Sequence, residues 1–577
     1  MNIPLQKLAQ RGSAPPGLSD TLKRPIVFDG TATPVKTALF LIICLAWLFP
    51  GLIGHDPWKP DEAIAMGIVY AMLSDNNLQV WLLPEIAGAA VNDYAPLYYW
   101  VSAITAKLFS FVLPMHDGAR LASGIFMAIT LVYVYKSANK LFDERAGRIA
   151  VALFIGSLGL LLRAHEMNPE LAGLAGMSVA TYGLTRIRFE ARKGAVTAAS
   201  GAIIMALSVG LVQALIVPVA AIVMMAILHD WQNSAFRRGI TILIVLLAAG
   251  ASIYPLVLAS CGWLTAPIFL DAIVGTPIFD VHTRDSILPL YLTSILPWYA
   301  LPTLPIAVWL WRKDRKVIRE RIELALPIAV FVVSLVMLSL LREGRDAVGL
   351  TLLLPLALAG ANSLDRLPKG VASFVDWFGL VFFGALALAI WVYWTAAVVG
   401  TPEAAARAAA RAAPGFVVGV VWIPMIIAAV LTSIWIYAVV MAHRNNRRAI
   451  VNWAAGITLV WMLLNLLYLP AVDHVRSYRQ PISEVASLVK QTPSCVIGLN
   501  IGDPQRAMFD YFAQIRFAKP KASTSENCAW MLIQGSKANA PDVATEWTLV
   551  WEGARPAERV EQFRLYKRSP SGIFKNL

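Results

Sequence analysis

His55-Asp56-Pro57-Trp58-Lys59-Pro60-Asp61-Glu62 follows directly on the first long apolar segment of the chain. Three of these eight residues are acids, and carboxylates beside a membrane-spanning segment are costly unless they have a partner or a task. A second cluster, Asn92-Asp93-Tyr94-Ala95-Pro96-Leu97-Tyr98-Tyr99-Trp100, precedes the next segment that could span. The two clusters together indicate a chamber at one membrane face, covered by an interfacial loop.

Composition defines the class of protein. Hydrophobic residues make up 58% of the 577 residues and charged residues 15%, and apolar runs long enough to cross a bilayer recur throughout. The formal net charge of +13 would suit a nucleic-acid partner in a soluble protein, but here Lys and Arg lie in short connections between apolar runs. The sequence therefore predicts a polytopic α-helical membrane protein that contacts the lipid bilayer and binds no nucleic acid.

The basic connections predict how the chain enters the membrane. Residues 1–35 are polar and basic and lack a small-residue cleavage pattern, which indicates a cytoplasmic N-terminal tail before an uncleaved first span. Segment 96–113 is expected to lie at the outer interface of the membrane, as part of a periplasmic loop 54–119. If it crossed the membrane, the basic residues of 136–148 would lie on the outer side, against the positive-inside rule. About 13 transmembrane helices result in a domain 36–471, near 36–53, 120–136, 148–162, 171–187, 195–209, 211–228, 239–260, 288–311, 323–341, 347–361, 374–398, 415–441 and 449–471.

The composition changes after residue 471. Residues 472–577 alternate amphipathic helix patterns with strand-like runs, which predicts a small α/β domain on the periplasmic side. The expected helices are 482–490 and 505–514, and the expected strands are Cys495 to Asn500, Ala529 to Gln534, Trp547 to Trp551 and Phe563 to Tyr566. Cys495 and Cys528 could form a disulfide or remain free thiols, and only the geometry of the pair decides between these alternatives.

The expected spans carry almost no ionisable residue in their middles, whereas ion-coupled transporters keep charges at mid-membrane. The charges that are not topology signals gather at the expected outer surface. They are Asp56, Asp61, Glu62, Asp93, His165, Glu166, Glu170, Asp280, His282, Arg284, Asp285, Arg342, Glu343, Arg345 and Asp346. Chemistry is therefore expected at that surface.

These residues carry a resemblance to a known family. His-Asp-Pro-Trp at 55–58, Asp61-Glu62 and Pro96-Leu97-Tyr98-Tyr99-Trp100 resemble the GT-C glycosyltransferases, above all the lipid A aminoarabinose transferases and more distantly the protein O-mannosyltransferases. A His/Arg loop at 280–285 and Leu-Arg-Glu-Gly-Arg at 341–345 follow in the family's order. The resemblance implies an enzyme of the bacterial inner membrane that transfers a sugar, with inversion, from a polyprenyl-phosphate donor to lipid A or another envelope glycan on the periplasmic side.

Sugar transfer to a hydroxyl needs an acceptor oxygen held in line and a carboxylate base. In the family an acid of the Asp-Glu pair lies at the reaction centre, so the resemblance implies that Asp61 is the base, with Glu62 and Asp93 as further catalytic acids. Pro60 before a helical run at 61–73 puts Asp61 near a helix start. Capping of that helix is the alternative role for Asp61.

The leaving phosphate needs cations, and Arg284, Arg342 and Arg345 are expected to supply them by charge-assisted hydrogen bonds, although each alone could anchor a lipid headgroup. Asp93 and His282 could together hold a divalent metal ion, because carboxylates and imidazoles are metal ligands. Glu166 and Glu170 lie four residues apart and are candidates for binding the acceptor, or else for a solvated helix end.

The chain departs from the aminoarabinose transferases where they carry Glu-Lys-Pro-Pro, because Asp93-Tyr94-Ala95-Pro96 stands there. Tyr94, at this donor-phosphate position, replaces a lysine suited to phosphate, so either the arginines alone hold the donor phosphate or the donor differs. The sugar is not readable. A protein O-glycosyltransferase of the same fold, a flippase of lipid-linked sugars and a catalytically inactive scaffold remain open.

Overall fold

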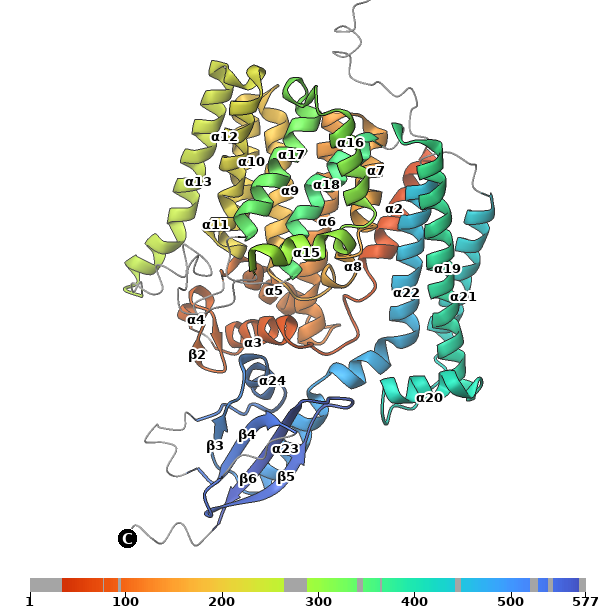
Figure 1. Cartoon of the computed structure of the whole chain (residues 1–577). Coiled ribbons are helices and arrows are strands. Elements are labelled where there is room, and N and C mark those ends of the chain that lie inside the picture. Colours follow the sequence, from red (N-terminus) through yellow and green to blue (C-terminus); the bar gives the residue numbers. More distant parts are fainter. Residues whose placement is uncertain are drawn as a thin grey trace, which may run out of the picture.

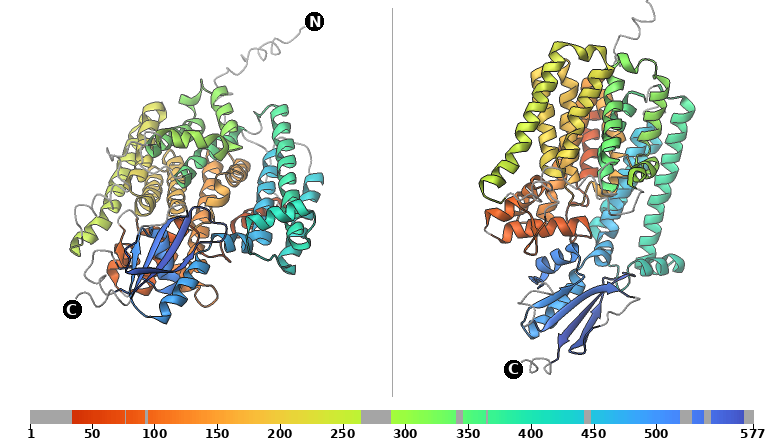
Figure 2. Two further views of the ribbon diagram at one scale, coloured as in Figure 1. Left: turned by 60° about the horizontal axis from the view of Figure 1, so that its bottom comes forward. Right: turned by 60° about the vertical axis from the view of Figure 1, so that its left-hand side comes forward.

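The structure is a computed structural model that describes residues 34–75, 77–91, 95–263, 288–339, 346–363, 366–441, 448–518, 528–537 and 543–569. A bundle of roughly aligned helices forms the larger part, and a small α/β body lies at one end of it (Figure 1). Figure 2 shows the same two parts from other sides, with the sheet beneath the bundle in the right-hand view.

The helices of the bundle follow the apolar runs of the sequence. They are α2 (Pro34–Leu48), α6 (Met115–Leu141), α7 (Glu144–Ile155), α8 (Leu160–Arg163), α9 (Glu170–Ile187), α10 (Ala191–Val209), α11 (Leu211–Ala214), α12 (Ile216–Ile227), α13 (Ser234–Ser260), α15 (Leu288–Tyr299), α16 (Thr303–Lys313), α17 (Ile322–Ser339), α18 (Leu350–Ser363), α19 (Lys369–Val399), α21 (Trp422–Met441) and α22 (Arg448–Arg476). Short 3-10 turns are η2 (His229–Gln232), η3 (Ile318–Glu320) and η4 (Asp346–Gly349), and α20 (Glu403–Ala412) is a surface helix.

Helices coincide with all the expected spans. Fewer than thirteen of the described helices are long and apolar enough to cross a membrane alone. Six of them, α6, α13, α17, α19, α21 and α22, are long and apolar enough to cross a membrane, and a bent pair would make seven, within the part of the chain that the structure describes. Shorter apolar helices cover 37–48, 211–227 and 346–362. Thirteen crossings therefore stay a prediction.

The segment 288–311 is not the single straight span that its hydropathy predicts. Tyr291–Tyr299 and Thr303–Lys313 meet at an angle of 100°. Pro297 and Pro302 lack backbone N–H groups and interrupt the helical hydrogen bonds there. The carbonyls of Tyr299 and Leu301 instead accept hydrogen bonds from the N–H groups of Gly159 at 2.8 Å and Leu158 at 3.2 Å, so the bend fixes the segment just before α8.

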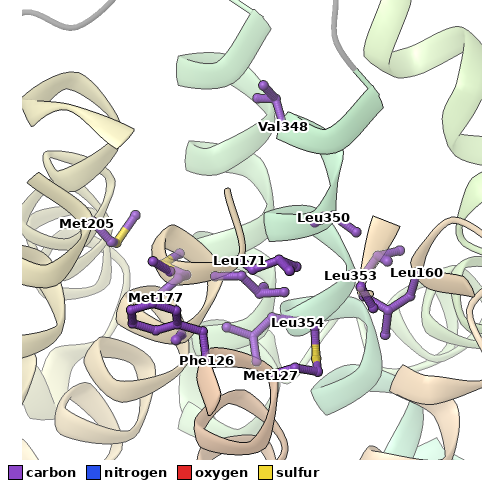
Figure 3. Packing of buried hydrophobic residues seen from close by; sticks show 14 of the residues in the cluster. Phe126, Met127, Leu160, Leu171, Met177, Met205, Val348, Leu350, Leu353 and Leu354 are labelled. Atoms are coloured by element: carbon purple, nitrogen blue, oxygen red, sulfur yellow. The ribbon is translucent and has the colours of Figure 1, made fainter. Parts of the chain in front are cut away.

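Close packing of small and apolar side chains holds the bundle together. Between α9 and α10 a Cβ at Gly201 or Gly183 would collide with the backbone of Ala180 or Ala198, so these glycines let the two helices approach. Figure 3 shows the neighbouring core, where Met127 of α6, Leu171 of α9 and Leu354 of α18 pack against one another.

The first loop forms short elements across the end of the bundle that faces the α/β body (Figure 1). They are α3 (Asp61–Ser74), α4 (Leu78–Leu82), α5 (Leu97–Leu108) and a hairpin of β1 (Glu85–Ile86) and β2 (Ala89–Ala90). The expected helix at 61–73 is thus confirmed as α3. A Cβ at Gly67 would meet that of Ala507 at 2.5 Å, so this glycine allows α3 to lie directly on a helix of the α/β body.

The C-terminal part has the helices and strands that its sequence pattern predicts. They are α23 (Arg479–Gln491), β3 (Val496–Leu499), α24 (Asp503–Ala513), β4 (Trp530–Ser536), β5 (Trp547–Gly553) and β6 (Glu561–Arg568), with strand order β3-β4-β6-β5. β3 is parallel to β4, and the other pairs are antiparallel. Cys495 and Cys528 form a disulfide, and α22 continues past the expected boundary at 471 to Arg476.

Candidate active site

Asp61 is the first residue of α3, at the end of the bundle. Its side chain is 14% exposed, and its Oδ2 accepts a hydrogen bond from Nη1 of Arg163 at 3.3 Å. Pro60, which precedes it, has no backbone N–H that would need a hydrogen-bond partner, and its φ and ψ are already near helical values. Both features suit the start of a helix. The carboxylate therefore has a fixed position at the base of α3.

Arg163 binds two further acids beside Asp61. Its Nη1 donates to Oε2 of Glu166 at 2.7 Å, and its Nε and Nη2 donate to the two carboxylate oxygens of Asp346 at 3.2 and 3.0 Å. The bond to Asp61 is the longest of these, so Asp61 is the acid that Arg163 holds least tightly. One guanidinium thus gathers acids from α3, η4 and the loop after α8.

Arg163, Glu166 and Asp346 line a cavity of about 400 Å³, and Asp61 lies beside it through its bond to Arg163. Its lining residues are Lys59, Pro60, Leu158, Gly159, Arg163, Glu166, Trp298, Tyr299, Asp346, Arg476 and Arg555. The bend between α15 and α16 supplies Trp298 and Tyr299, and the α/β body supplies Arg555. The cavity therefore combines acids, cations and aromatic side chains, as a site for a sugar or a sugar phosphate would require.

Glu62 lies next to Asp61 in sequence but points into the protein, where it is 1% exposed. Its Oε1 accepts from Nε of Arg120 at 2.7 Å and from the N–H of Met167 at 3.1 Å, and its Oε2 accepts from the N–H of Trp58. Burial alone would raise its pKa, but Arg120 and His55 hold the pKa of Glu62 below its usual value. The ionised Glu62 ties α3 to α6 and to the loop before α9.

The two acceptor candidates of the sequence lie in different surroundings. Burial raises the pKa of Glu166 to about 7, against the opposing charge of Arg163, so this carboxyl titrates near neutrality at the cavity wall. Glu170 is the first residue of α9, and its Oε1 accepts from Nε2 of Gln213 at 3.2 Å. Only Glu166 lines the cavity.

The remaining predicted site residues lie outside the described residues. They are Asp93, Tyr94, His282, Arg284, Arg342 and Arg345. Their roles toward the donor phosphate, and a metal ion between Asp93 and His282, stay predictions. Among the residues that the structure describes, no group of three or more His, Cys, Asp or Glu side chains could hold a metal ion.

Sequence reasoning missed the residue at the centre of the site. Arg163 ends a short apolar run, and a basic residue in that position is usually explained by membrane topology. No sequence pattern indicates that it contacts Asp61 or Asp346. The sequence also did not predict that Lys59, Arg476 and Arg555 line the site. They are far apart in the chain and meet only when the α/β body docks. Arg120, taken as the start of a span, proves to be a fully buried partner of Glu62.

The fold and the site define a class of protein. A helical membrane bundle with an acid-bearing first loop at one end, covered by a small α/β body, is the arrangement expected of a GT-C glycosyltransferase, and comparison with known proteins agrees. Residues 93–258 match the family described as dolichyl-phosphate-mannose-protein mannosyltransferase. The crystal structure of ArnT from Cupriavidus metallidurans bound to undecaprenyl phosphate has a TM-score of 0.65 to this chain, at 16% identity over 92% of this chain and 98% of that one.

The curated relatives are undecaprenyl phosphate-alpha-4-amino-4-deoxy-L-arabinose arabinosyl transferases. Those of Pseudomonas savastanoi pv. phaseolicola and Pseudomonas aeruginosa are each 30% identical, over 123 and 128 residues, or 21% and 22% of this chain. The matched stretch spans about a fifth of the length of these relatives, 22% in both cases. The chain is therefore a multi-pass helical membrane protein with a GT-C-type fold that resembles the aminoarabinose transferases, as its motifs predict.

Proposed function

We propose that the chain is a glycosyltransferase of the bacterial inner membrane that moves a sugar from a polyprenyl-phosphate donor to lipid A or another envelope acceptor on the periplasmic side. The observation that carries the proposal is Asp61, fixed at the start of α3 beside Arg163 at the edge of the 400 Å³ cavity. The names of the curated relatives support the donor class. The disulfide supports the periplasmic side for the α/β body, because disulfides persist in oxidising compartments.

In this proposal Asp61 is the general base. Its carboxylate takes the proton of an acceptor hydroxyl while that oxygen forms a bond to the sugar carbon, and the bond from that carbon to the phosphate oxygen breaks on the opposite face. The leaving polyprenyl phosphate carries away the electron pair of the broken bond. Attack in line inverts the configuration at the sugar carbon.

The other charged residues have supporting roles in the proposal. Arg163, fixed by Glu166 and Asp346, orients the Asp61 carboxylate through a bond of 3.3 Å. Glu62 holds the first loop in place from inside the protein. Arg284, Arg342, Arg345 and Tyr94 are proposed to bind the donor phosphate, Asp93 to be a further acid of the site, and Glu170 to act with Glu166 toward the acceptor.

The test is sugar transfer by the purified protein in lipid nanodiscs, with a labelled polyprenyl-phosphate sugar and lipid A. Asp61→Asn removes the base and keeps the shape, so it should lower the rate by a factor of about 10² to 10⁴. Asp75→Asn is the matched control, because Asp75 lies exposed at the other end of α3. Unchanged turnover by Asp61→Asn in a folded protein contradicts the assignment of the base.

Two further measurements separate the alternatives. Movement of the labelled lipid across the bilayer without any covalent product would favour a flippase. Mass spectrometry of envelope lipids from a deletion strain should reveal the missing sugar and its lipid acceptor. Unchanged envelope lipids would favour a protein acceptor.

A further inference from the structure

The cavity beside Asp61 has a second group of charged side chains that the proposed chemistry does not use. Lys59 lies in the first loop, Arg476 is the last residue of α22, and Arg555 lies between β5 and β6. Three distant parts of the chain thus bring cations to one cavity. Arg163 is already engaged, because its Nε, Nη1 and Nη2 contact the carboxylates of Asp61, Glu166 and Asp346.

Arg476 is exposed, and its guanidinium lies over the ring of Trp58, 5.3 Å from the ring centroid. Trp58 is itself held, because its Nε1 donates to Oδ1 of Asp473 at 2.9 Å and its ring stacks on His55 at 4.0 Å. Within the described part of the chain, no carboxylate comes within ion-pair distance of the Arg476 guanidinium. The aromatic ring therefore positions this cation without neutralising it.

Arg555 is 12% exposed, and its Nη1 donates to the carbonyl oxygen of Arg476 at 3.3 Å. Its Nη2 contacts Glu558 and, at 3.4 Å, Glu561, which also lies 3.4 Å from Nζ of Lys59. The Nε of Arg555 is buried and has no hydrogen-bond partner among the described residues. Glu558 and Glu561 therefore pair with Lys59 and Arg555, and Arg476 contacts neither of these carboxylates.

We propose that Arg476 and Arg555, with Lys59, form a subsite for a phosphate group of a lipid-borne substrate. Guanidinium groups match phosphate oxygens with paired N–H donors, and two of them at one cavity wall make phosphate the best-suited anion. A base in the last turn also stabilises the helix dipole, but that role does not require Arg476 to lie on Trp58 at the cavity. The inference rests on the proposed function and gives the α/β body a direct part in binding substrate.

The phosphate could belong to the polyprenyl donor or to a phosphorylated acceptor lipid, and a binding experiment distinguishes the two. The full-length protein in nanodiscs is titrated separately with undecaprenyl phosphate and with lipid A, without turnover. Arg476→Ala is expected to weaken the binding of one of these lipids about tenfold or more, since hydrogen bonds to charged groups are lost. Arg476→Lys should recover part of the affinity.

The design keeps folding and catalysis apart from binding. Arg476 is exposed and forms no ion pair with the residues that the structure describes, so its replacement should leave the fold intact, and Arg411→Ala on α20 is the matched exposed control. Asp61→Asn should bind both lipids as the wild type does. If the wild type transfers no sugar but Arg476→Ala still loses lipid affinity, the proposed function fails and the subsite stands. Unchanged affinity of Arg476→Ala for both lipids, or no binding of either lipid by the wild type, overturns the subsite.

Discussion

At the residue scale, the site depends on how one guanidinium is shared among three acids. Nη1 of Arg163 contacts Glu166 at 2.7 Å and Asp61 at 3.3 Å, so the two carboxylates compete for the same N–H donors. Asp346 holds the rest of the group through both of its oxygens. The charge state of Glu166 is therefore expected to change the strength of the hydrogen bond between Arg163 and Asp61.

This competition predicts a pH dependence. The pKa of Glu166 is about 7, so the carboxyl is neutral in acid and ionised in base. A neutral Glu166 releases Nη1 toward Asp61, which becomes a poorer base. Transfer by the wild type should therefore rise with pH through about 7. Glu166→Gln mimics the neutral form and should be slow at every pH, with no inflection there.

The measurement is kcat/KM for sugar transfer between pH 5.5 and 8.5, a range of about 1.5 units on either side of the inflection. Glu144→Gln is the control, because Glu144 is a 46% exposed acid paired with Arg148 on α7, and its profile should match the wild type. An inflection that survives in Glu166→Gln would assign the titration to another group.

Asp61 and Glu62 are neighbours in the sequence but lie in different surroundings. Successive residues of a helix point about 100° apart, so the Asp61 carboxylate turns toward Arg163 beside the cavity and the Glu62 carboxylate enters the core. The sequence pattern predicted both as catalytic, and it had no means of identifying Arg120 as the buried partner of Glu62.

The buried pair predicts a loss of stability. Glu62→Gln leaves the fully buried Arg120 with Asp117, at 2.8 Å, as its remaining carboxylate, and should lower the free energy of unfolding by about 3 kcal/mol. Thermal unfolding in detergent would register this as a lower Tm, whereas Asp61→Asn should unfold near the wild-type temperature. A wild-type Tm combined with lost transfer in Glu62→Gln would instead give Glu62 a part in the reaction.

At the element scale, hydropathy and periodicity predicted where helices and strands lie but not how they bend or meet. The helices α23 and α24 and all four strands of the large sheet stand where their patterns put them. The bend at Tyr299 escaped prediction, because 288–311 is apolar throughout and its prolines are compatible with a kinked span. The break matters for function, since it brings Trp298 and Tyr299 to the cavity.

The disulfide gives a prediction for the sheet. Cys495 and Cys528 are 33 residues apart and stand just before the parallel strands β3 and β4. In the chain-entropy account, a loop of this length contributes about 3–4 kcal/mol. The double variant Cys495→Ser with Cys528→Ser should therefore expose the amides of β3 and β4 to hydrogen exchange more than those of α22. Cys44→Ser, at a free thiol of α2, is the control, and unaltered protection of β3 would contradict the prediction.

At the scale of the whole molecule, the cavity is complete only when the α/β body is docked on the bundle. Besides the packing of α3 on α24, Asp56 links the two parts, because its carboxylate accepts from Ser477 at 2.6 Å and from Nε of Arg479 at 2.9 Å. Tyr511 of α24 contacts His116 of α6 at 2.9 Å, which adds a second point of attachment. Arg555 reaches the active-site cavity only through this docking.

Loss of the Asp56 link should therefore loosen the α/β body and slow the reaction together. Burial alone would raise the pKa of Asp56, but Arg479 and Ser477 hold it below 3.8, so its contribution is complete above pH 3.8 and is lost as the pH falls through the lowered value. At neutral pH, Asp56→Ala should increase hydrogen exchange and proteolysis near 473–479 while the sheet β3-β4-β6-β5 keeps its protection. Transfer should fall several-fold, because Arg555 no longer stays at the cavity. Arg506→Ala, at a 25% exposed arginine of α24 that pairs with Asp503, should change neither measurement. If Asp56→Ala loosens the junction but leaves transfer unchanged, the bundle alone forms the active site, and the α/β body has no share in substrate binding.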